Sequence, residues 1–223
     1  MTQGDNVRVR RIGVLGGGQL GRMMGLAGIP LGFEFLFLDP GADACAGVAG
    51  GLVQAGFDDE VAARGLADRV DVATYDFENV PEASARALEA VTPLHPSPEA
   101  LGACQDRLVE KSLLTDLGIA VGPYHPVSSR TDLLAGLEKL GYPAVLKTRR
   151  FGYDGKGQAV LRDPEDLERA WQRLGDAPLV LEAFVPFEAE CSLVGVRGRD
   201  GETCFWPVSY THLRAHETVL VIS

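Results

Sequence analysis

The first hundred residues alternate between short apolar runs and segments in which apolar positions recur with helical spacing. The apolar runs are rich in Ile, Val, Leu and Phe, which is typical of buried strands. We expect strands at 11–15, 33–38 and 70–74 and helices at 19–28, 58–69 and 81–90. Because strands that alternate with helices form parallel sheets with right-handed crossovers, this pattern predicts an α/β fold with a parallel sheet covered on both faces.

The pattern changes after the proline-rich segment 92–98. Beyond it we expect helices at 99–117, 131–140 and 164–174 and strands at 144–147, 158–161, 179–182, 190–197 and 203–206. A turn at Gly198–Gly201 joins the last two strands as a hairpin. These elements indicate an α+β module with antiparallel pairing. We therefore expect two domains, one at 1–98 and one at 99–207.

Composition and charge exclude several classes of protein. Apolar residues make up 46% of the chain and charged residues 23%, which is typical of a globular protein. No apolar run is long enough to predict a membrane span. The net charge of −10 argues against binding to a nucleic-acid backbone. The four cysteines have no metal-ligand spacing, so we expect reduced thiols in the cytoplasm and no metal site.

A first glycine-rich loop, Gly16–Gly21, matches GxGxxG between an expected strand and an expected helix. Such a loop lets the backbone approach an anion at a helix N-terminus. Together with Asp39 at the end of the second strand, it would suit an NAD-dependent dehydrogenase that binds a ribose hydroxyl. Two alternatives are a tight turn without a ligand at Gly16–Gly21 and a simple turn-forming role for Asp39, which precedes Pro-Gly.

A second glycine-rich loop carries basic residues. Lys147 ends an expected strand, and Gly152–Gln158 follows with three glycines and Lys156. Such a loop is able to fold over a polyphosphate and neutralise it, although it is not a Walker A sequence. The alternative is a flexible basic hairpin tip. Further on, Glu182 and Glu190 flank an apolar segment that would line an adenine pocket, or they form a solvated acidic edge.

Four motifs together resemble one family of ATP-grasp ligases, the N5-carboxyaminoimidazole ribonucleotide synthetases of purine biosynthesis. The motifs are Gly16–Met23 (GGGQLGRM), Thr74–Pro81 (TYDFENVP), Gly152–Gln158 (GYDGKGQ) and Phe184–Glu188 (FVPFE). The resemblance runs in register from about Arg10 to Pro207. It implies a Rossmann-like lobe followed by a partial ATP-grasp module. Another ATP-grasp carboxylate–amine ligase and a non-catalytic nucleotide-binding module are the neighbouring alternatives.

The resemblance also implies a reaction. The family uses ATP and bicarbonate to carboxylate the amine of 5-aminoimidazole ribonucleotide, and it releases ADP and phosphate. Because bicarbonate is a poor electrophile, transfer of the γ-phosphoryl group would give carboxyphosphate, which the enzyme must shield from water. Mg²⁺ is the implied metal, and a homodimer of the family's type is left open for the complete protein. No nucleic acid or membrane partner is implied.

The resemblance assigns roles residue by residue. The residues implied to bind ATP are Arg107, Lys147, Gly152, Tyr153, Asp154, Gly155, Lys156, Gly157, Gln158, Glu182, Ala183, Phe184, Val185 and Glu190. Lys147, Tyr153 and Lys156 are the implied catalytic residues. Gln19 and Leu20 would contact the imidazole ribonucleotide, with Glu78 on its ribose. Alternatively, Arg107 is a solvated surface charge and Tyr153 a brace for the loop. For His95 and His125 we expect no chemical role.

The resemblance ends at Pro207. Members of the family continue with the acidic residues that hold Mg²⁺ and with further substrate contacts, so we expect this chain to be an inactive fragment. The segment 208–223 resembles a translated sequencing adapter instead, and we expect it to be non-native. His212 and His216 in this segment are not expected to bind a metal.

Overall fold

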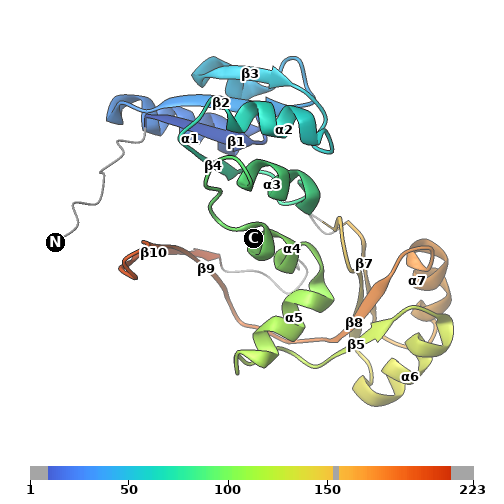
Figure 1. The fold of residues 1–223 in the computed structure, drawn as a ribbon. Coiled ribbons are helices and arrows are strands. Elements are labelled where there is room, and N and C mark those ends of the chain that lie inside the picture. The colour runs from blue at the N-terminus through green and yellow to red at the C-terminus, as the bar shows by residue number, and fades with distance from the viewer. Residues whose placement is uncertain (1–9, 153–155, 212–223) are drawn as a thin grey trace. The chain divides into compact units, whose positions relative to one another are not determined.

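The computed structural model of the chain describes residues 10–152 and 156–211. The chain divides into two compact units, Met1–Asp116 and Leu117–Ile222. The division falls after Asp116 because α4 packs on α3 and α5 packs on α4, whereas the sequence placed a boundary at residue 98. Figure 1 labels the elements of both units.

The elements of the first unit include two short 3-10 helices, η1 and η2. In chain order they are β1 (Arg11–Leu15), α1 (Gln19–Gly28), η1 (Ile29–Leu31), β2 (Glu34–Asp39), η2 (Cys45–Ala49), β3 (Gly51–Gln54), α2 (Glu60–Ala67), β4 (Val72–Tyr75), α3 (Glu82–Glu89), α4 (Pro98–Gln105) and α5 (Arg107–Asp116).

A four-stranded parallel sheet with the order β3-β2-β1-β4 forms the centre of the first unit. Alternate residues of β2 face opposite sides of this sheet, since successive side chains of a strand point in opposite directions. Leu36 and Leu38 pack in one cluster with residues of α2 and α3. Phe35 and Phe37 pack in another cluster with Met24 of α1. The expected Rossmann-like lobe with a parallel sheet is confirmed.

Helix α1 lies unusually close to the sheet because its inward positions are glycines. A Cβ atom added at Gly25 would lie 2.7 Å from the Cβ of Ala49 and 3.2 Å from the ring of Phe37. Real Cβ atoms do not approach that closely, so a larger residue would push the helix outward. The large apolar side chains of α1, such as Leu20 and Met23, are exposed instead.

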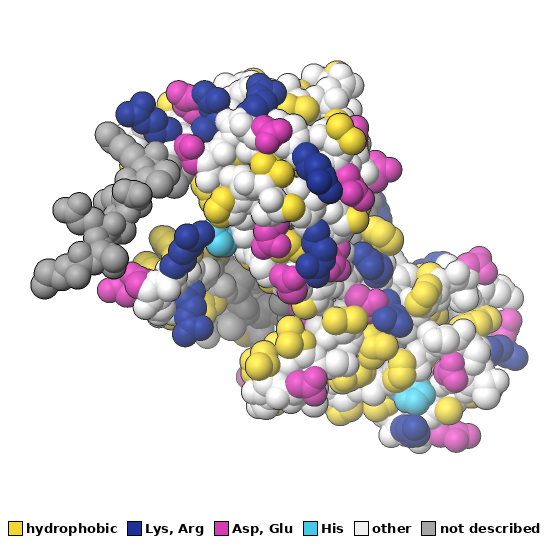
Figure 2. Space-filling model, in the orientation of Figure 1, with side chains coloured by type: hydrophobic (Ala, Val, Ile, Leu, Met, Phe, Trp, Pro, Cys, Tyr) yellow, Lys and Arg dark blue, Asp and Glu magenta, His cyan; other side chains and the backbone are white. Residues whose placement is uncertain are grey.

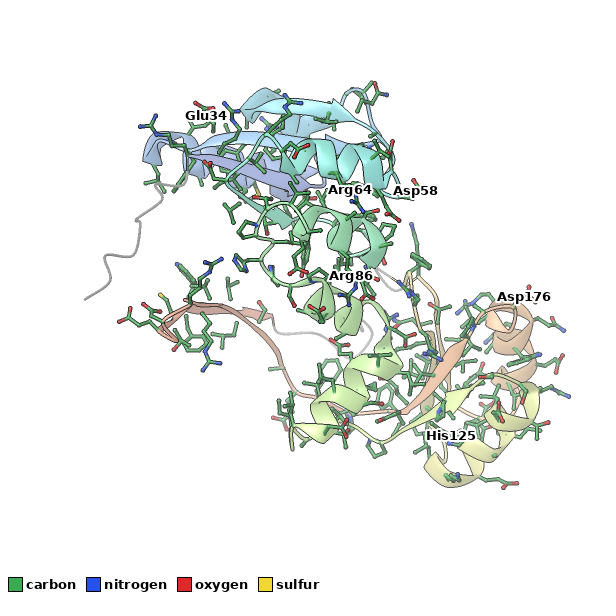
Figure 3. All side chains as sticks on the ribbon, in the orientation of Figure 1. Glu34, Asp58, Arg64, Arg86, His125 and Asp176 are labelled. Carbon is green, nitrogen blue, oxygen red and sulfur yellow. The ribbon has the colours of Figure 1, made fainter. Side chains whose placement is uncertain are left out.

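The expected helix at 99–117 is wrong in one respect, since it is two helices that meet at Asp106. The backbone of Asp106 is extended, and its side chain accepts a hydrogen bond from the N–H of Leu108 at 2.9 Å. An Asp in this arrangement caps a new helix and interrupts the old one. Arg86 of α3, which Figure 3 labels, forms ion pairs with Glu82 of the same helix and with Glu99 of α4, and the second pair connects the two helices.

The second unit is built from antiparallel strands and two helices. Its elements are β5 (Tyr124–Val127), α6 (Arg130–Leu140), β6 (Ala144–Thr148), β7 (Gln158–Leu161), α7 (Asp166–Leu174), β8 (Leu179–Ala183), β9 (Glu190–Arg197) and β10 (Thr203–Thr211). One sheet has the order β5-β8-β6-β7, and β9 pairs with β10 as a hairpin. The expected α+β texture is confirmed.

The apolar core of the second unit lies between one face of its four-stranded sheet and helices α6 and α7. Leu146 and Leu181, which are opposite each other in the β6–β8 ladder, are both fully buried there. His125 of β5, labelled in Figure 3, packs against Gly136 of α6, where an added Cβ would lie 2.8 Å from the ring. This histidine therefore has a packing role.

The structure contains strands that the sequence analysis did not predict or predicted too short. Strands β3 and β5 were not expected from the hydrophobic pattern. Strand β10 continues past Pro207 to Thr211, with a shift in register between Trp206 and Ser209, so the start of the segment expected to be non-native pairs with β9. The remainder of that segment lies outside the described residues. Within the described part of the chain, no helix has the length and apolar character needed to cross a membrane.

Candidate functional site

The first candidate site lies at the carboxyl edge of the parallel sheet, where β1 and β4 are neighbours. The chain runs from β1 to β2 and β3 on one side and then returns to place β4 on the other side. The order of strands reverses at this point, which is where open α/β sheets ordinarily bind their ligands. Leu15 and Tyr75, the last residues of the two strands, are paired in register.

The first glycine-rich loop, Gly16–Gly21, directs two of its N–H groups at carboxylates of the protein itself. The N–H of Gly17 donates to Asp39 at 2.8 Å, and Asp39 also accepts from the N–H of Gly41 at 2.8 Å. The N–H of Gly21 donates to Asp76 at 2.8 Å. Asp39 is therefore a loop- and turn-forming residue, and the ribose-binding role needed by a dehydrogenase has no support.

The surroundings of Asp76 raise the pKa of its carboxyl group. Partial burial raises the pKa of this carboxyl above its ordinary value, and the negative charge of Asp39 acts in the same direction. The N–H groups of Gly21 and Gly18 oppose the effect and lower the pKa, but burial is the larger cause. The sequence analysis assigned no role to Asp76, although this residue lies in the TYDFENVP motif and directly follows the end of β4, which is where sheet-edge ligands are found.

Three predicted substrate residues lie on the two loops of this edge. Gln19 and Leu20 begin α1 and are exposed, and Glu78 is exposed in the loop after β4. The buried Gln105 fixes the Glu78 loop by donating to the carbonyl oxygens of Glu78 at 2.9 Å and Val80 at 2.6 Å. Gln105 was missed because its partners lie on a distant segment of the chain.

The second candidate site lies on the sheet of the second unit. Lys147 of β6 is opposite Gln158 of β7, and Val145 is opposite Glu182 of β8. Opposite residues of antiparallel strands share a face, so Lys147, Gln158 and Glu182 all lie on the face away from the α6–α7 core. The ammonium group of Lys147 donates to Glu182 at 2.9 Å, and both side chains are largely buried, with relative exposures of 5% and 14%.

The second glycine-rich loop connects β6 to β7 directly above Lys147 and Gln158. The N–H of Thr148 donates to the carbonyl of Gly157 at 2.8 Å. Gly157 has a φ of 72°, and an added Cβ would lie 2.5 Å from the hydroxyl of Thr148, so only glycine fits this position without movement. Lys156 is exposed in the loop. Tyr153, Asp154 and Gly155 lie outside the described residues.

Beyond β8 the chain passes through the segment expected to contact adenine. The N–H of Ala183 donates to the carbonyl of Pro123 at 2.9 Å, and the N–H of Phe184 donates to that of Pro143 at 3.3 Å. Phe184 and Val185 have exposed side chains. The backbone of Glu190 begins β9, but its side chain lies outside the described part of the structure.

Arg107 is the last of the residues predicted to bind ATP. It begins α5 in the first unit, and its role toward ATP stays a prediction.

The described residues offer no metal-binding cluster, since no group of three His, Cys, Asp or Glu side chains among them is arranged to hold a metal ion. Figure 2 shows Lys and Arg side chains interspersed with Asp and Glu on the face drawn, with no continuous basic surface among the residues coloured there.

Comparison with family models matches both parts of the chain. A ribonucleotide synthetase preATP-grasp domain matches residues 9–105, and an ATP-grasp domain matches residues 112–223. The N5-carboxyaminoimidazole ribonucleotide synthase of Pseudomonas aeruginosa is 51% identical over 203 residues, which are 91% of this chain and 56% of that protein. The chain therefore spans slightly more than half the length of this relative.

Solved structures give the same result. The N5-carboxyaminoimidazole ribonucleotide synthetase of Thermus thermophilus is 49% identical, with a TM-score of 0.83 over 92% of this chain and 55% of that one. The Aspergillus clavatus N5-carboxyaminoimidazole synthase, solved with ADP and 5-aminoimidazole ribonucleotide, is 28% identical, with a TM-score of 0.82 over 93% of this chain and 55% of that one. Together with the fold and the two loops, these matches show that the chain belongs to the ATP-grasp family and is similar to its N5-carboxyaminoimidazole ribonucleotide synthases.

Proposed function

We propose that this chain is part of an ATP-grasp ligase that carboxylates 5-aminoimidazole ribonucleotide with bicarbonate and converts ATP to ADP and phosphate. The observation that carries the proposal is the grouping of Lys147, Gln158 and Glu182 on one sheet face at the base of a basic glycine-rich loop. Further support comes from the relatives, one of which was solved with ADP and the aminoimidazole nucleotide.

In this proposal the second unit binds ATP. Lys147 and Lys156 offset the phosphate charge, while the loop Gly152–Gln158 covers the phosphates and limits access of water. Glu182 accepts from the adenine amino group. The N–H of Ala183 already donates to the carbonyl of Pro123. We therefore assign the carbonyl of Ala183, together with the backbone of Val185, to the adenine edge.

The remaining ATP contacts rest on the resemblance. We assign the ribose hydroxyls to Glu190, the phosphates to Arg107 and the loop cover to Tyr153, Asp154 and Gly155. Phe184 would pack beside the base, because its ring is exposed at the end of β8. Lys147, Tyr153 and Lys156 are the proposed catalytic residues.

The first unit would bind the aminoimidazole nucleotide at the carboxyl edge of its parallel sheet. Gln19 and Leu20 contact the nucleotide, and Glu78 accepts from its ribose hydroxyls. The fixed Glu78 loop supports this role, since Gln105 holds two of its carbonyl groups. Binding in this way orients the exocyclic amine for attack on the activated carboxyl group.

Mg²⁺ is the metal that the family's chemistry implies. The described residues do not fit it, because they contain no cluster of suitable ligands. We therefore assign no metal ligand and derive no step through the ion. Bicarbonate as the carboxyl donor, a homodimer of the complete protein and a cytoplasmic location are also part of the proposal, and their support is the resemblance alone.

The proposed activity is tested with a chimera in which residues 1–207 are joined to the C-terminal part of the Pseudomonas aeruginosa relative. ATP turnover by the chimera should require both bicarbonate and 5-aminoimidazole ribonucleotide. Turnover with a different amine acceptor, and none with this nucleotide, would indicate another ATP-grasp carboxylate–amine ligase. The 223-residue chain serves as the comparison, and we expect no turnover from it.

A further inference from the structure

The N-terminus of α1 holds a carboxylate in the position where a glycine-rich loop ordinarily receives a ligand phosphate. Asp76 accepts from the N–H of Gly21 at 2.8 Å, within the first turn of the helix. A Cβ atom added at Gly16 would lie 1.4 Å from one oxygen of this carboxylate, and one added at Gly21 would lie 2.9 Å from the other. The glycines of the loop therefore make room for a side chain of the protein.

A second carboxylate acts on the same loop. Asp39, from the end of β2, accepts from the N–H of Gly17 at 2.8 Å, and an added Cβ at Gly17 would lie 2.9 Å from the Cβ of Asp39. Asp39 and Asp76 thus hold the loop from the ends of β2 and β4, the two strands that flank β1. Their charges are close enough that Asp39 contributes to the raised pKa of Asp76.

Two fixed negative charges at this position oppose the binding of a third. A helix N-terminus attracts one anion with its N–H groups, and here Asp76 satisfies the N–H of Gly21 from within the fold. A phosphate that entered the loop would have to displace this carboxylate or approach it in a partly buried environment, where repulsion is weakly screened.

We propose that Asp76 and Asp39 are specificity-determining residues that fix the Gly16–Gly21 loop and keep ligand phosphates away from the N-terminus of α1. This inference rests on the proposed function for its ligand: the aminoimidazole nucleotide meets Gln19 and Leu20 with its ring or its ribose, and its 5′-phosphate points away from the loop. Asp76 and Asp39 act by positioning the loop and take no part in the reaction itself.

The test uses the 223-residue chain labelled with ¹⁵N-glycine and titrated with pyrophosphate. In the wild-type chain the amide signals of Gly17, Gly18 and Gly21 should not shift at millimolar concentrations. In Asp76→Ala they should shift with saturation, with a dissociation constant at least about tenfold below the highest concentration tested on the wild-type chain, since a charge-assisted hydrogen bond is worth about 1.5–3 kcal/mol. The matched control is Asp43→Ala, which removes an exposed charge nearby and should behave as the wild type.

A wild-type measurement guards against a variant that fails to fold. In a uniformly ¹⁵N-labelled wild-type chain, the aminoimidazole nucleotide and its dephosphorylated ribonucleoside should both shift the Gln19 and Leu20 amides in the same pattern. Pyrophosphate shifts at Gly21 of the wild-type chain, or Gln19 and Leu20 shifts produced by the nucleotide but not by the ribonucleoside, would overturn the inference.

The inference and the proposed function fail in different ways. If neither the nucleotide nor the ribonucleoside binds to the chimera, but Asp76→Ala gains pyrophosphate binding, the proposed substrate is wrong and the exclusion of phosphate is upheld. If wild type and Asp76→Ala bind pyrophosphate equally, the exclusion is wrong whatever the substrate.

Discussion

The two glycine-rich loops of this chain follow strands in the same way, yet they differ in the charges that surround them. The loop Gly16–Gly21 donates to two carboxylates, Asp39 and Asp76, which come from the ends of the two strands that flank β1. The loop Gly152–Gln158 begins near the buried Lys147 and carries Lys156. The glycine pattern indicates where the backbone turns tightly, whereas we propose that the side chains around each loop decide which ligand it binds.

The topology around each loop explains this difference. In the parallel sheet, the ends of β2 and β4 flank the end of β1, so residues far apart in the sequence meet at the first loop. The second loop joins two antiparallel strands, and its basic residues come from its own hairpin. The first loop is therefore controlled by distant residues and the second largely by local ones.

The largest expected effect comes from breaking the buried ion pair of the second site. Glu182→Ala leaves the ammonium group of Lys147 buried without its carboxylate, so we expect the second unit to lose about 3 kcal/mol of unfolding free energy. Urea unfolding of the 223-residue chain measures the change. Glu138→Ala, at an exposed position of α6, is the control, and an equal loss in both variants would show that the pair contributes nothing.

The next effect concerns ATP. In the chimera, Lys147→Ala should lower kcat/KM for ATP by about ten- to a hundredfold, because a charged hydrogen bond to phosphate is worth about 1.5–3 kcal/mol. Steady-state kinetics with varied ATP measure it. Lys139→Ala removes an exposed positive charge from α6 and should leave the constant unchanged. A loss below about twofold for Lys147→Ala would indicate that this lysine only ends a strand.

The first site predicts a selective effect on the other substrate. Glu78→Ala in the chimera should raise KM for 5-aminoimidazole ribonucleotide about tenfold, while KM for ATP changes little, since Glu78 is assigned to the ribose of that nucleotide. Parallel titrations of the two substrates provide the measurement. Glu89→Ala, an exposed acid at the end of α3, is the control. Equal changes for both substrates would argue against a nucleotide site at this edge.

The smallest expected effect is the difference in pH dependence between Asp71 and Asp76, which lie at the two ends of β4. Asp71 accepts from the N–H groups of Arg10 and Arg11 at 2.8 and 2.9 Å, and these bonds lower its pKa below the ordinary 3.8. Its stabilising contribution is therefore complete above pH 3.8 and is lost as pH falls through the lowered pKa. The pH dependence of the contribution from Asp76 has the opposite sign. Because its pKa is raised, ionisation of Asp76 lowers the stability of the folded state as pH rises from 3.8.

Carboxyl ¹³C NMR of the folded chain measures this pair directly. Asp71 should titrate at a lower pH than Asp76. If the two midpoints occur in the reverse order, the hydrogen bonds of Asp71 or the burial of Asp76 are not those of the folded protein in solution.

Much of the fold was predictable because its strands are continuous apolar runs. The four buried residues Phe35–Leu38 identify β2 without knowledge of its neighbours. The break at Asp106 was missed because Asp is tolerated in a helix, and only its hydrogen bond to the N–H of Leu108 reveals the cap. Strands β3 and β5 were missed because four residues of mixed polarity give little periodic signal.

The candidate sites were predictable only in part, for a similar reason. The glycines, Lys147 and Glu182 stand in recognisable motifs, but the bond between Lys147 and Glu182 depends on the register of β6 with β8. The role of Asp76 depends on the N–H of Gly21, 55 residues away in the sequence. Contacts of this kind become visible only when the sheet is assembled.

The most direct test of the account is a single titration of the ¹⁵N-glycine-labelled 223-residue chain with ATP. Gly152 and Gly157 should shift with saturation, while Gly17, Gly18 and Gly21 should keep their positions over the same range. This result would show that the basic loop admits the polyphosphate and that the carboxylate-filled loop does not. Saturable shifts at Gly17 and Gly21, with Gly152 and Gly157 unmoved, would contradict the central claim.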